Sequence, residues 1–329
     1  MKKQNNNLVE LVKLLNSNDF HDGNELGKKL GITRSAVWKG IKKLKTYGID
    51  IKSVKGKGYC LPEDLVLYEK ELILDKLNLN KKFLSLIDLK IFESVTSTND
   101  YLKTINFQNK IVICVAEEQT KGRGRFARYW HSPFGQNIYF SIGFDFMKDI
   151  SSLMGVSLVV GLAVLNAIKK YGIAENFFIK WPNDILWDNK KIAGILIDAN
   201  AEINGNCKLI IGVGLNLNMI TVTDRSDPKP RISLKEIIGY AIDKNKMVAL
   251  LIDSIFSFVK KFETEGLSAF IEQWDKHDYL CEKAITVGIG NTEEEGICKG
   301  IDQQGRLVLQ LSNGICKAFA SGDATIVQR

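Results

Sequence analysis

Apolar residues recur at helical spacing near the start of the chain and predict three short helices. Leucines and valines between positions 7 and 16 repeat every three or four residues, as on one face of an α-helix. A second helix is expected at 24–30 and a third at 33–47, separated by a tight Gly-Ile turn. Thr33 is a good N-cap for the third helix because its hydroxyl can accept a hydrogen bond from a backbone N–H of the first turn.

The third predicted helix has one apolar face and one basic face. Its apolar residues are Ala36, Val37, Ile41 and Leu44, and the residues expected in solvent are Arg34, Ser35, Lys39, Lys42 and Lys43. A lysine- and glycine-rich hairpin is predicted next, at 49–59. Helices followed by a basic hairpin predict a winged helix-turn-helix whose third helix enters the major groove of DNA.

Positive charge is concentrated in this first region. Residues 1–60 contain 13 lysines and arginines and 5 acidic residues, whereas the whole chain has a net charge of +7. The concentration favours a module that faces nucleic acid; the alternative is three packed helices with solvated lysines. The residues expected to contact DNA are Thr33, Arg34, Ser35, Trp38, Lys39, Lys42, Lys55 and Lys57.

Patterns beyond residue 60 predict a linker, a mixed α/β domain and a β-rich end. Residues 65–82 read as an amphipathic helix. Strands are expected near 88–94, 111–117, 137–144, 177–181, 192–202 and 207–218, and helices near 98–106, 151–171, 232–239 and 243–265. Short strands with glycine-containing turns predict a small β-barrel after residue 280. The expected regions are 1–62 (winged helix-turn-helix), 63–85 (linker and helix), 86–275 (mixed domain) and 276–329 (β domain).

Composition limits the class of protein. The chain is 45% hydrophobic and 25% charged, which is typical of a soluble globular protein. No apolar run reaches the roughly 18–20 residues of a membrane span, and no secretory signal is visible, so we expect a cytoplasmic protein with no membrane partner. The six cysteines have no paired spacing and the three histidines are isolated, which predicts reduced thiols and no structural zinc.

The most distinctive stretch is the basic segment from Lys121 to Trp130. Its ten residues include three arginines, one lysine and two glycines. Guanidinium groups bind carboxylates and phosphates, and glycines let backbone N–H groups approach an anion closely. Two later stretches, 180–184 and 212–216, support a site for a multiply anionic ligand. For the basic segment alone, a solvated turn is the alternative.

The glycine spacing of this segment also matches a dinucleotide-binding fingerprint, Gly122-x-Gly124-x-x-Ala127. That fingerprint requires a strand directly before the first glycine and a helix directly after the loop. Here residues 117–121 separate the glycine from the preceding apolar run, and Pro133 leads into a strand-like segment. The sequence therefore argues against a Rossmann nucleotide site.

The order of the motifs carries a family resemblance. After the predicted winged helix come Ser97-Thr98-Asn99, Gln119 with Gly-Arg-Gly-Arg at 122–125, Lys180-Trp181-Pro182-Asn183-Asp184, Lys191–Leu196 and Gly212-x-Gly214-x-Asn216. Over essentially its whole length the chain closely resembles the bifunctional biotin–protein ligases that also act as biotin operon repressors. The resemblance implies an α+β multidomain protein: a winged helix-turn-helix, a class II synthetase-like mixed α/β catalytic domain and an SH3-like C-terminal β-barrel.

The resemblance also implies a two-step reaction and its partners. Biotin and ATP with Mg²⁺ would give biotinyl-5′-AMP, and the biotinyl group would then pass to a lysine of a carboxylase carrier protein. Members of this family form homodimers when biotinyl-AMP binds and repress biotin genes by binding operator DNA. We expect both activities in this chain.

Site residues follow from the resemblance by position. The expected catalytic residues are Lys180, near the biotin carboxylate and the α-phosphate, and Arg125, on the phosphate. Arg123 would hold the loop closed. The expected contacts of biotin and the adenylate are Ser97, Thr98, Asn99, Gln119, Arg123, Gly124, Arg125, Trp130, Lys180, Asn183, Gly194 and Asn216. Mg²⁺ would be held through the ATP phosphates, with Asp184 as the candidate for a direct ligand.

One departure from the family pattern lies in the basic segment. A common family form reads Gly-Arg-Gly-Arg-Arg-Gly-Arg, and Phe126 and Ala127 stand here in place of its Arg-Gly. Three other functions stay open: a ligase with a non-functional DNA-binding head, a ligand-sensing transcription regulator without ligase activity, and a lipoate–protein ligase. Lys180 and the intact Gly-Arg-Gly-Arg argue against a pure sensor, and the winged helix, that loop and the C-terminal β domain favour biotin over lipoate.

Overall fold

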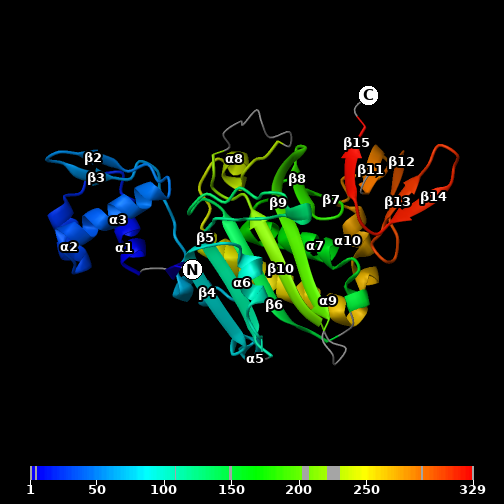
Figure 1. Cartoon of the computed structure of the whole chain (residues 1–329), viewed down its shortest axis with the longest axis horizontal. Coiled ribbons are helices and arrows are strands. Elements are labelled where there is room, and N and C mark those ends of the chain that lie inside the picture. Colours follow the sequence, from blue (N-terminus) through cyan, green and yellow to red (C-terminus); the bar gives the residue numbers. More distant parts are fainter. Residues whose placement is uncertain are drawn as a thin grey trace.

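Three regions follow one another along the long axis of the molecule (Figure 1). The computed structural model describes residues 2–3, 6–107, 109–147, 150–201, 207–220, 230–289 and 292–327. A helical head lies at one end, a sheet with its helices forms the centre, and a β-rich region lies at the other end.

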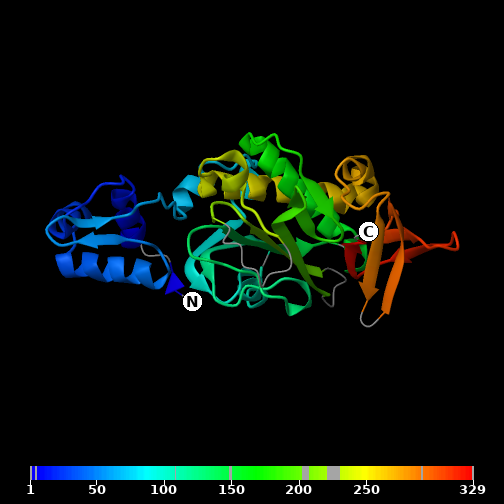
Figure 2. The ribbon, with the colours of Figure 1, turned by 90° about the horizontal axis from the view of Figure 1, so that it is seen from above.

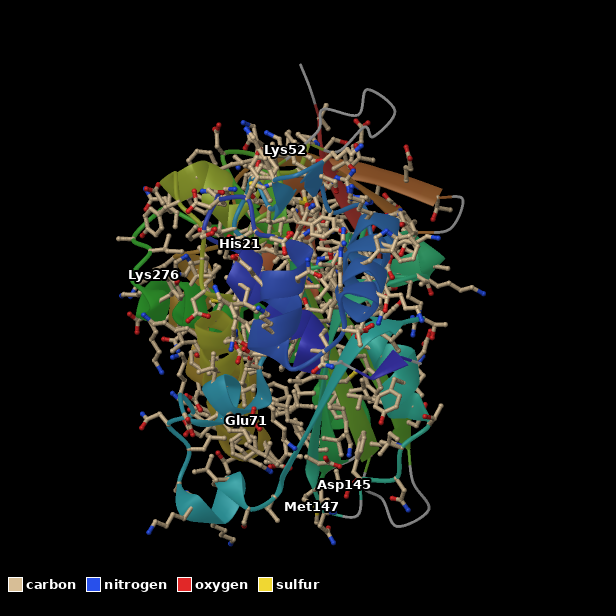
Figure 3. The ribbon with its side chains drawn as sticks, turned by 90° about the vertical axis from the view of Figure 1, so that its left-hand side faces the viewer. His21, Lys52, Glu71, Asp145, Met147 and Lys276 are labelled. Carbon is tan, nitrogen blue, oxygen red and sulfur yellow. The ribbon has the colours of Figure 1, made fainter. Side chains whose placement is uncertain are left out.

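The head consists of three helices and a hairpin, as predicted. These elements are α1 (Asn6–Leu15), α2 (Gly23–Leu30), α3 (Arg34–Thr46), β2 (Lys52–Val54) and β3 (Gly58–Cys60). Thr33 caps α3, because its Oγ1 accepts a hydrogen bond from Ala36 N at 3.2 Å. Figure 3 views the molecule from this end, with the head in front and Lys52 of the hairpin labelled.

The head packs against the central region through the last turns of α3. Phe134 of the central region belongs to the same buried apolar cluster as the core of the head. Lys43 forms an ion pair with Glu93, whose side chain is 1% exposed. Lys43, which was expected in solvent, is only partly exposed at 32%, because the buried carboxylate needs a charged or hydrogen-bonding partner.

The linker contains no long helix, so the prediction of one amphipathic helix over 65–82 is wrong. Only two short helices form, α4 (Lys70–Leu74) and α5 (Lys81–Leu84). Side chains from other regions take the backbone groups that a helix would use: Asn16 bonds both Leu65 N and Leu65 O. Glu117 likewise accepts from Tyr68 N at 2.6 Å. The apolar residues of the linker are buried by docking and not along a helix face.

A mixed eight-stranded sheet forms the centre, in the order β1-β4-β5-β6-β10-β9-β8-β7. Only the β4–β5 pair among these neighbours is parallel. The strands are β1 (Lys2–Lys3), β4 (Ile87–Val95), β5 (Ile111–Gln119), β6 (Ile138–Phe146), β7 (Phe178–Lys180), β8 (Asp184–Trp187), β9 (Lys190–Ala201) and β10 (Cys207–Leu215). The short strand β8 was not among the predicted strands, and its four residues carry too little periodicity to reveal it.

Different helices cover the two faces of this sheet. The long helices α7 (Val156–Tyr171) and α9 (Lys244–Glu265) lie together on one face (Figure 2). Alternate residues of β5, such as Ile113 and Val115, join that core, whereas Cys114 and Ala116 belong to a second cluster on the other face, with α6 (Thr98–Lys103). The face under α6 is only partly covered by helix, which leaves room for a site.

Two helices of the central region differ in length from the prediction. Helix α7 begins at Val156 and not at 151, because Gly155 has φ 82° and follows a 3₁₀ turn, η2 (Ile150–Leu153). The predicted helix at 232–239 is α8 (Leu234–Ile238), which Ser233 and Glu236 cap reciprocally.

The C-terminal region is a five-stranded antiparallel sheet in the order β14-β13-β12-β11-β15. It follows η3 (Leu267–Phe270) and α10 (Ile271–Asp275), and its strands are β11 (Ala284–Ile289), β12 (Thr292–Ile301), β13 (Leu307–Gln310), β14 (Cys316–Phe319) and β15 (Asp323–Ile326). The turn predicted at Gly290 lies outside the described residues. Buried residues of this sheet, such as Ile285, continue the main core. Across the described residues, no helix is long and apolar enough to cross a membrane.

Candidate active site

A cavity of about 480 Å³ opens on the face of the central sheet that carries α6. Its wall contains every residue for which the sequence predicted a ligand or metal contact: Ser97, Thr98, Asn99, Gln119, Arg123, Gly124, Arg125, Trp130, Lys180, Asn183, Asp184, Gly194 and Asn216. These residues come from five separate stretches of the chain, at 97–99, 119–130, 180–184, 194 and 216. The fold therefore gathers them into one site, which is the first requirement of the prediction.

One end of the cavity is polar and buried. Gln119 Oε1 accepts hydrogen bonds from Thr98 N at 2.9 Å and from Thr98 Oγ1 at 3.2 Å. Behind them, Ser141 Oγ lies 2.7 Å from Thr98 Oγ1 and 2.6 Å from Asn99 Oδ1. Ser97 caps α6, as the sequence indicates, by accepting from Asp100 N. Donors and acceptors of fixed direction thus meet at this end, which suits a small polar ring more than a hydrocarbon chain.

Glycines of β9 and β10 form the floor of the cavity. A Cβ atom at Gly214 would lie 2.4 Å from the ring of Trp130, and one at Gly212 would lie 2.2 Å from Asn99 Oδ1. A Cβ at Gly194 would lie 3.1 Å from the Trp130 ring. The two glycines of the Gly-x-Gly-x-Asn motif are therefore required because side chains from other elements rest directly on the strand backbone.

The ring of Trp130 lies on the glycines of this floor. Its side chain is partly buried, and Nε1 is buried with no hydrogen-bond partner among the residues that the structure describes. Lys191 Nζ lies 5.2 Å from the centre of its ring, a cation–π contact. The indole ring therefore lies against these glycines and forms part of the cavity wall.

We call residues 121–131 the ligand loop. Its first half is anchored to the sheet by Arg123, whose Nη2 lies 2.8 Å from Asp100 Oδ1 and 3.0 Å from Asp198 Oδ2. Burial raises the pKa of Asp198, but hydrogen bonds from Asn99 and Lys103 and the charge of Arg123 outweigh it, so this pKa lies below its ordinary value. Arg123 therefore acts on the loop backbone through α6 and β9.

The stretch Lys180–Asp184 is a tight turn between β7 and β8 at the cavity wall. Asn183 is fixed by two hydrogen bonds to Ile195 of β9, from Nδ2 to O at 2.8 Å and from Ile195 N to Asn183 O at 2.9 Å. Lys180 and Asp184 face each other in the register of this turn. The turn thus delivers one cation and one carboxylate to the same wall.

Lys191 is a residue that sequence reasoning missed. Its Nζ lies 2.6 Å from Asp184 Oδ1, and the residue lines the cavity beside Lys180. The signal for it is its place in the stretch Lys191-Ile192-Ala193-Gly194, three residues before the predicted glycine. The wall therefore carries two lysines, and Asp184 is already engaged by one of them.

Asn216 supports the wall rather than reaching into the open cavity. It is 2% exposed, and its Nδ2 donates to Lys191 O at 3.2 Å and to Ile232 O at 3.3 Å. These bonds hold the neighbouring residue Arg231 and Lys191 on adjacent segments at the cavity. Burial and then the charge of Arg231 lower the pKa of His131, another lining residue, so its imidazole is neutral at neutral pH.

The C-terminal region also contributes to the site, which the sequence did not indicate. Asp323 and Ala324 line the cavity. Arg125 Nη1 donates to Gly322 O at 3.0 Å, and Arg128 forms an ion pair with Asp323. Trp181, next to Lys180, donates from Nε1 to Gly305 O at 3.1 Å. The cavity is thus closed on one side by a region more than a hundred residues away in the chain.

The donor set of the cavity can be compared with the needs of Mg²⁺. Within the described ranges, no group of three or more His, Cys, Asp or Glu side chains could hold a metal ion. Asp184 offers a carboxylate, but Lys191 shares it. Such a wall fits a magnesium ion that keeps most of its ligands from phosphate and water.

Comparisons with known proteins agree with this site. Family models match at residues 7–60 (HTH domain), 91–216 (biotin/lipoate A/B protein ligase family) and 280–326 (biotin protein ligase C terminal domain). The bifunctional ligase/repressor BirA of Escherichia coli (strain K12) is 34% identical over 98% of each chain. The same-named protein of Bacillus subtilis (strain 168) is 29% identical over 95% of this chain and 96% of its own.

A solved structure has the same fold in its ligase part. The biotin protein ligase from Aquifex aeolicus, in complex with biotin and ATP, is 26% identical with a TM-score of 0.62. The match covers 74% of this chain and 99% of that one. From the near full-length similarity at 34% identity, the chain belongs to the family of bifunctional biotin ligase/repressors.

Proposed function

We propose that the cavity binds biotin and ATP, forms biotinyl-5′-AMP and passes the biotinyl group to a lysine of a carrier protein. The observation that carries this proposal is the cavity itself. The cavity combines a buried hydrogen-bonding end with a wall that carries two lysines and the arginines of the ligand loop. A ligand with a polar ring at one end and an acyl phosphate at the other matches both.

The polar end is the proposed site of the ureido ring of biotin. That ring presents one carbonyl and two N–H groups, so it needs both donors and acceptors. The hydroxyls and amides of Ser97, Thr98, Asn99 and Gln119 offer both kinds at this end of the cavity. The Gln119–Thr98 bonds orient them before a ligand arrives.

The cationic wall is the proposed site of the first chemical step. The carboxylate oxygen of biotin attacks the α-phosphorus of ATP, the new C–O–P bond forms, and the bond to the β-phosphate breaks as pyrophosphate leaves. Both reactants are anions, so fixed cations lower the barrier most. Lys180 and Arg125 are the proposed catalytic residues, with Lys191 as a further cation at the same wall. When bound, Mg²⁺ would neutralise phosphate charge beside Asp184.

In the second step, the amine of the carrier lysine attacks the acyl carbon and AMP leaves with its phosphate oxygens. The ligand loop, with Arg123 as its anchor, would keep water from the adenylate until the carrier arrives. The neutral His131 lies at this cavity and adds no charge to repel an incoming lysine.

The head is the proposed DNA-binding part, with α3 in the major groove and the hairpin on phosphates. Arg34, Ser35, Trp38, Lys39 and Lys42 are exposed on α3, and Lys55 and Lys57 are exposed at the hairpin tip. We further propose that two copies pair when the adenylate binds, that 276–329 is an SH3-like domain behind a class II synthetase-like one, and that the protein is cytoplasmic.

Two alternatives are weaker on particular observations. A ligand sensor without ligase activity would not need two lysines and the loop arginines at one cavity. A lipoate ligase shares the catalytic family model, but the additional match to the biotin ligase C-terminal model favours biotin.

The deciding experiment incubates the purified chain with ATP and Mg²⁺ plus either biotin or lipoate. Mass spectrometry should detect the acyl-adenylate with biotin. If an adenylate forms with lipoate alone, the proposal of biotin as the substrate is wrong. If no adenylate forms with either acid, the proposed enzyme activity is wrong.

A further inference from the structure

Two arginines of the ligand loop converge on one residue of the C-terminal sheet, Asp323. Arg128 pairs with Asp323, and Arg125 Nη1 lies 3.9 Å from Asp323 Oδ1. The ring of Phe126 contacts both arginines, with its centre 4.9 Å from the Arg125 guanidinium and 5.6 Å from that of Arg128. Phe126 is 65% exposed, so burial of its ring does not account for its position.

The two arginines have different surroundings. The Arg125 side chain is 22% exposed and lines the cavity, whereas that of Arg128 is 55% exposed. Arg125 gives one of its five N–H donors to the Gly322 carbonyl. Arg128 meets the carboxylate of Asp323 directly and offsets its charge, which would otherwise repel phosphate at this wall.

The loop backbone is strained at the same point. Phe126 has φ 54° and Ala127 also has φ 54°, the left-handed region that side chains with a Cβ rarely adopt. Strained conformations persist only where surrounding contacts hold them. Here the holding contacts are those of Arg125 and Arg128 with the C-terminal sheet.

We propose that Phe126 and Asp323 form a clamp, by which we mean contacts that hold the ligand loop closed against the C-terminal sheet. In this clamp Arg128 binds the carboxylate of Asp323, and Arg125 is held where it can contact phosphate in the cavity. The aromatic ring packs against both guanidinium groups, of which Arg128 meets the carboxylate directly and Arg125 also lines the cavity. Phe126 and Asp323 are positioning residues, because they act through the arginines. The link to adenylate retention rests on the proposed function, whereas loop closure does not.

Hydrogen–deuterium exchange of the loop amides in the full-length, unliganded protein tests the clamp. Each exposed cation–π contact is worth about a two- to fivefold change in an equilibrium, so Phe126→Ala should speed exchange over 124–130 by about fivefold. Asp323→Asn should have a similar or larger effect, and the double variant should add little, since both open the same clamp. Asp323→Glu, which keeps the carboxylate, should restore most of the protection.

Matched controls are Tyr240→Ala, which removes another aromatic side chain that is 58% exposed, and Glu294→Gln, which breaks a pair with Lys317 in the same C-terminal sheet. Neither should change loop exchange. Unchanged exchange in both Phe126→Ala and Asp323→Asn would overturn the clamp.

A second readout measures release of biotinyl-adenylate into solution. Both clamp variants should release more than the wild type while the rate of adenylate formation changes less. If the wild type makes no adenylate but the exchange pattern holds, the clamp stands and the proposed function fails. If exchange rises but the released adenylate does not, the clamp does not serve retention and that part of the proposal is overturned.

Discussion

The ring of Tyr47, at the end of α3, stacks on the ring of Phe134 with centroids 4.1 Å apart and an interplanar angle of 5°. Phe134 lies three residues after the ligand loop, and Ser132 between them accepts a hydrogen bond from Gln119 of the cavity. Burial and the nearby Glu93 raise the pKa of Tyr47 to about 12, so its hydroxyl stays protonated and can donate to Glu93. Helix α3 and the cavity are thus joined by a few direct contacts.

Replacement of Phe134 by alanine should loosen the head. Phe134 is 1% exposed, and loss of a buried phenylalanine costs about 3–5 kcal/mol. We expect thermal unfolding of the head to separate from that of the central region, while adenylate formation falls only modestly. Calorimetry and an adenylation assay measure the two effects. Phe20→Ala, at a head residue that is 39% exposed, is the control. A single unfolding transition at the wild-type midpoint would contradict the role of this stack.

Lys180→Ala should nearly abolish adenylate formation and leave the fold intact. Loss of one fixed cation at an anionic transition state typically costs on the order of 10²–10³ in rate. Single-turnover kinetics with biotin and ATP measure the loss, and circular dichroism checks the fold. Lys190 precedes Lys191 in the chain but does not line the cavity, so Lys190→Ala should retain the wild-type rate. If Lys191→Ala loses adenylate formation and Lys180→Ala keeps it, then Lys191 is the essential cation.

Arg125→Gly should give a working but leaky enzyme. Without this guanidinium the loop loses its bond to Gly322 and its proposed contact with the phosphate. Biotinyl-AMP should then escape and label lysines on bystander proteins in a mixture that lacks carrier. Streptavidin blots of albumin in that mixture provide the measurement. Labelling no greater than with the wild type would count against the assignment.

Sequence reasoning located the cavity residues better than it located what holds them. The Gly-Arg-Gly-Arg, Lys180–Asp184 and Gly212–Asn216 stretches are each continuous, so their residue types could be interpreted locally. Asp323 could not be predicted, because its pairing with Arg128 depends on how two distant regions dock. The helix predicted for the linker is wrong for a related reason. The apolar spacing is helical, but the side chains of Asn16 and Glu117 accept hydrogen bonds from backbone N–H groups of the linker outside any helix.

Acid should weaken the loop anchor only at low pH. The pKa of Asp198 lies below its ordinary value of 3.8, so its carboxylate with Arg123 stabilises the folded loop above that value. This contribution is lost as pH falls through the lowered pKa of the folded state. Loop exchange, corrected for the intrinsic pH dependence of amide exchange, should therefore show no step from Asp198 between pH 8 and about pH 5. In Asp198→Asn the corrected exchange should be faster throughout and show no acid step. If loop exchange in the wild type changes in a step near pH 6, a group other than Asp198 controls the loop in that range.

Biotinyl-AMP should control operator binding through dimer formation. The excess positive charge lies in residues 1–60, so operator binding should fall steeply with salt, and one head alone makes too few phosphate contacts to bind tightly. If the adenylate drives pairing of two copies, biotinyl-AMP should increase dimer formation and operator affinity together, because a ligand shifts an equilibrium only by its preference for one state. Sedimentation and gel shifts on the upstream DNA, each with and without biotinyl-AMP, measure both. Removal of residues 1–62 should abolish DNA binding and leave partial ligase activity, since it exposes Phe134 but spares every residue of the cavity. If the protein with biotinyl-AMP bound stays monomeric and does not bind this DNA, the repressor prediction is wrong and the head has no DNA-binding role.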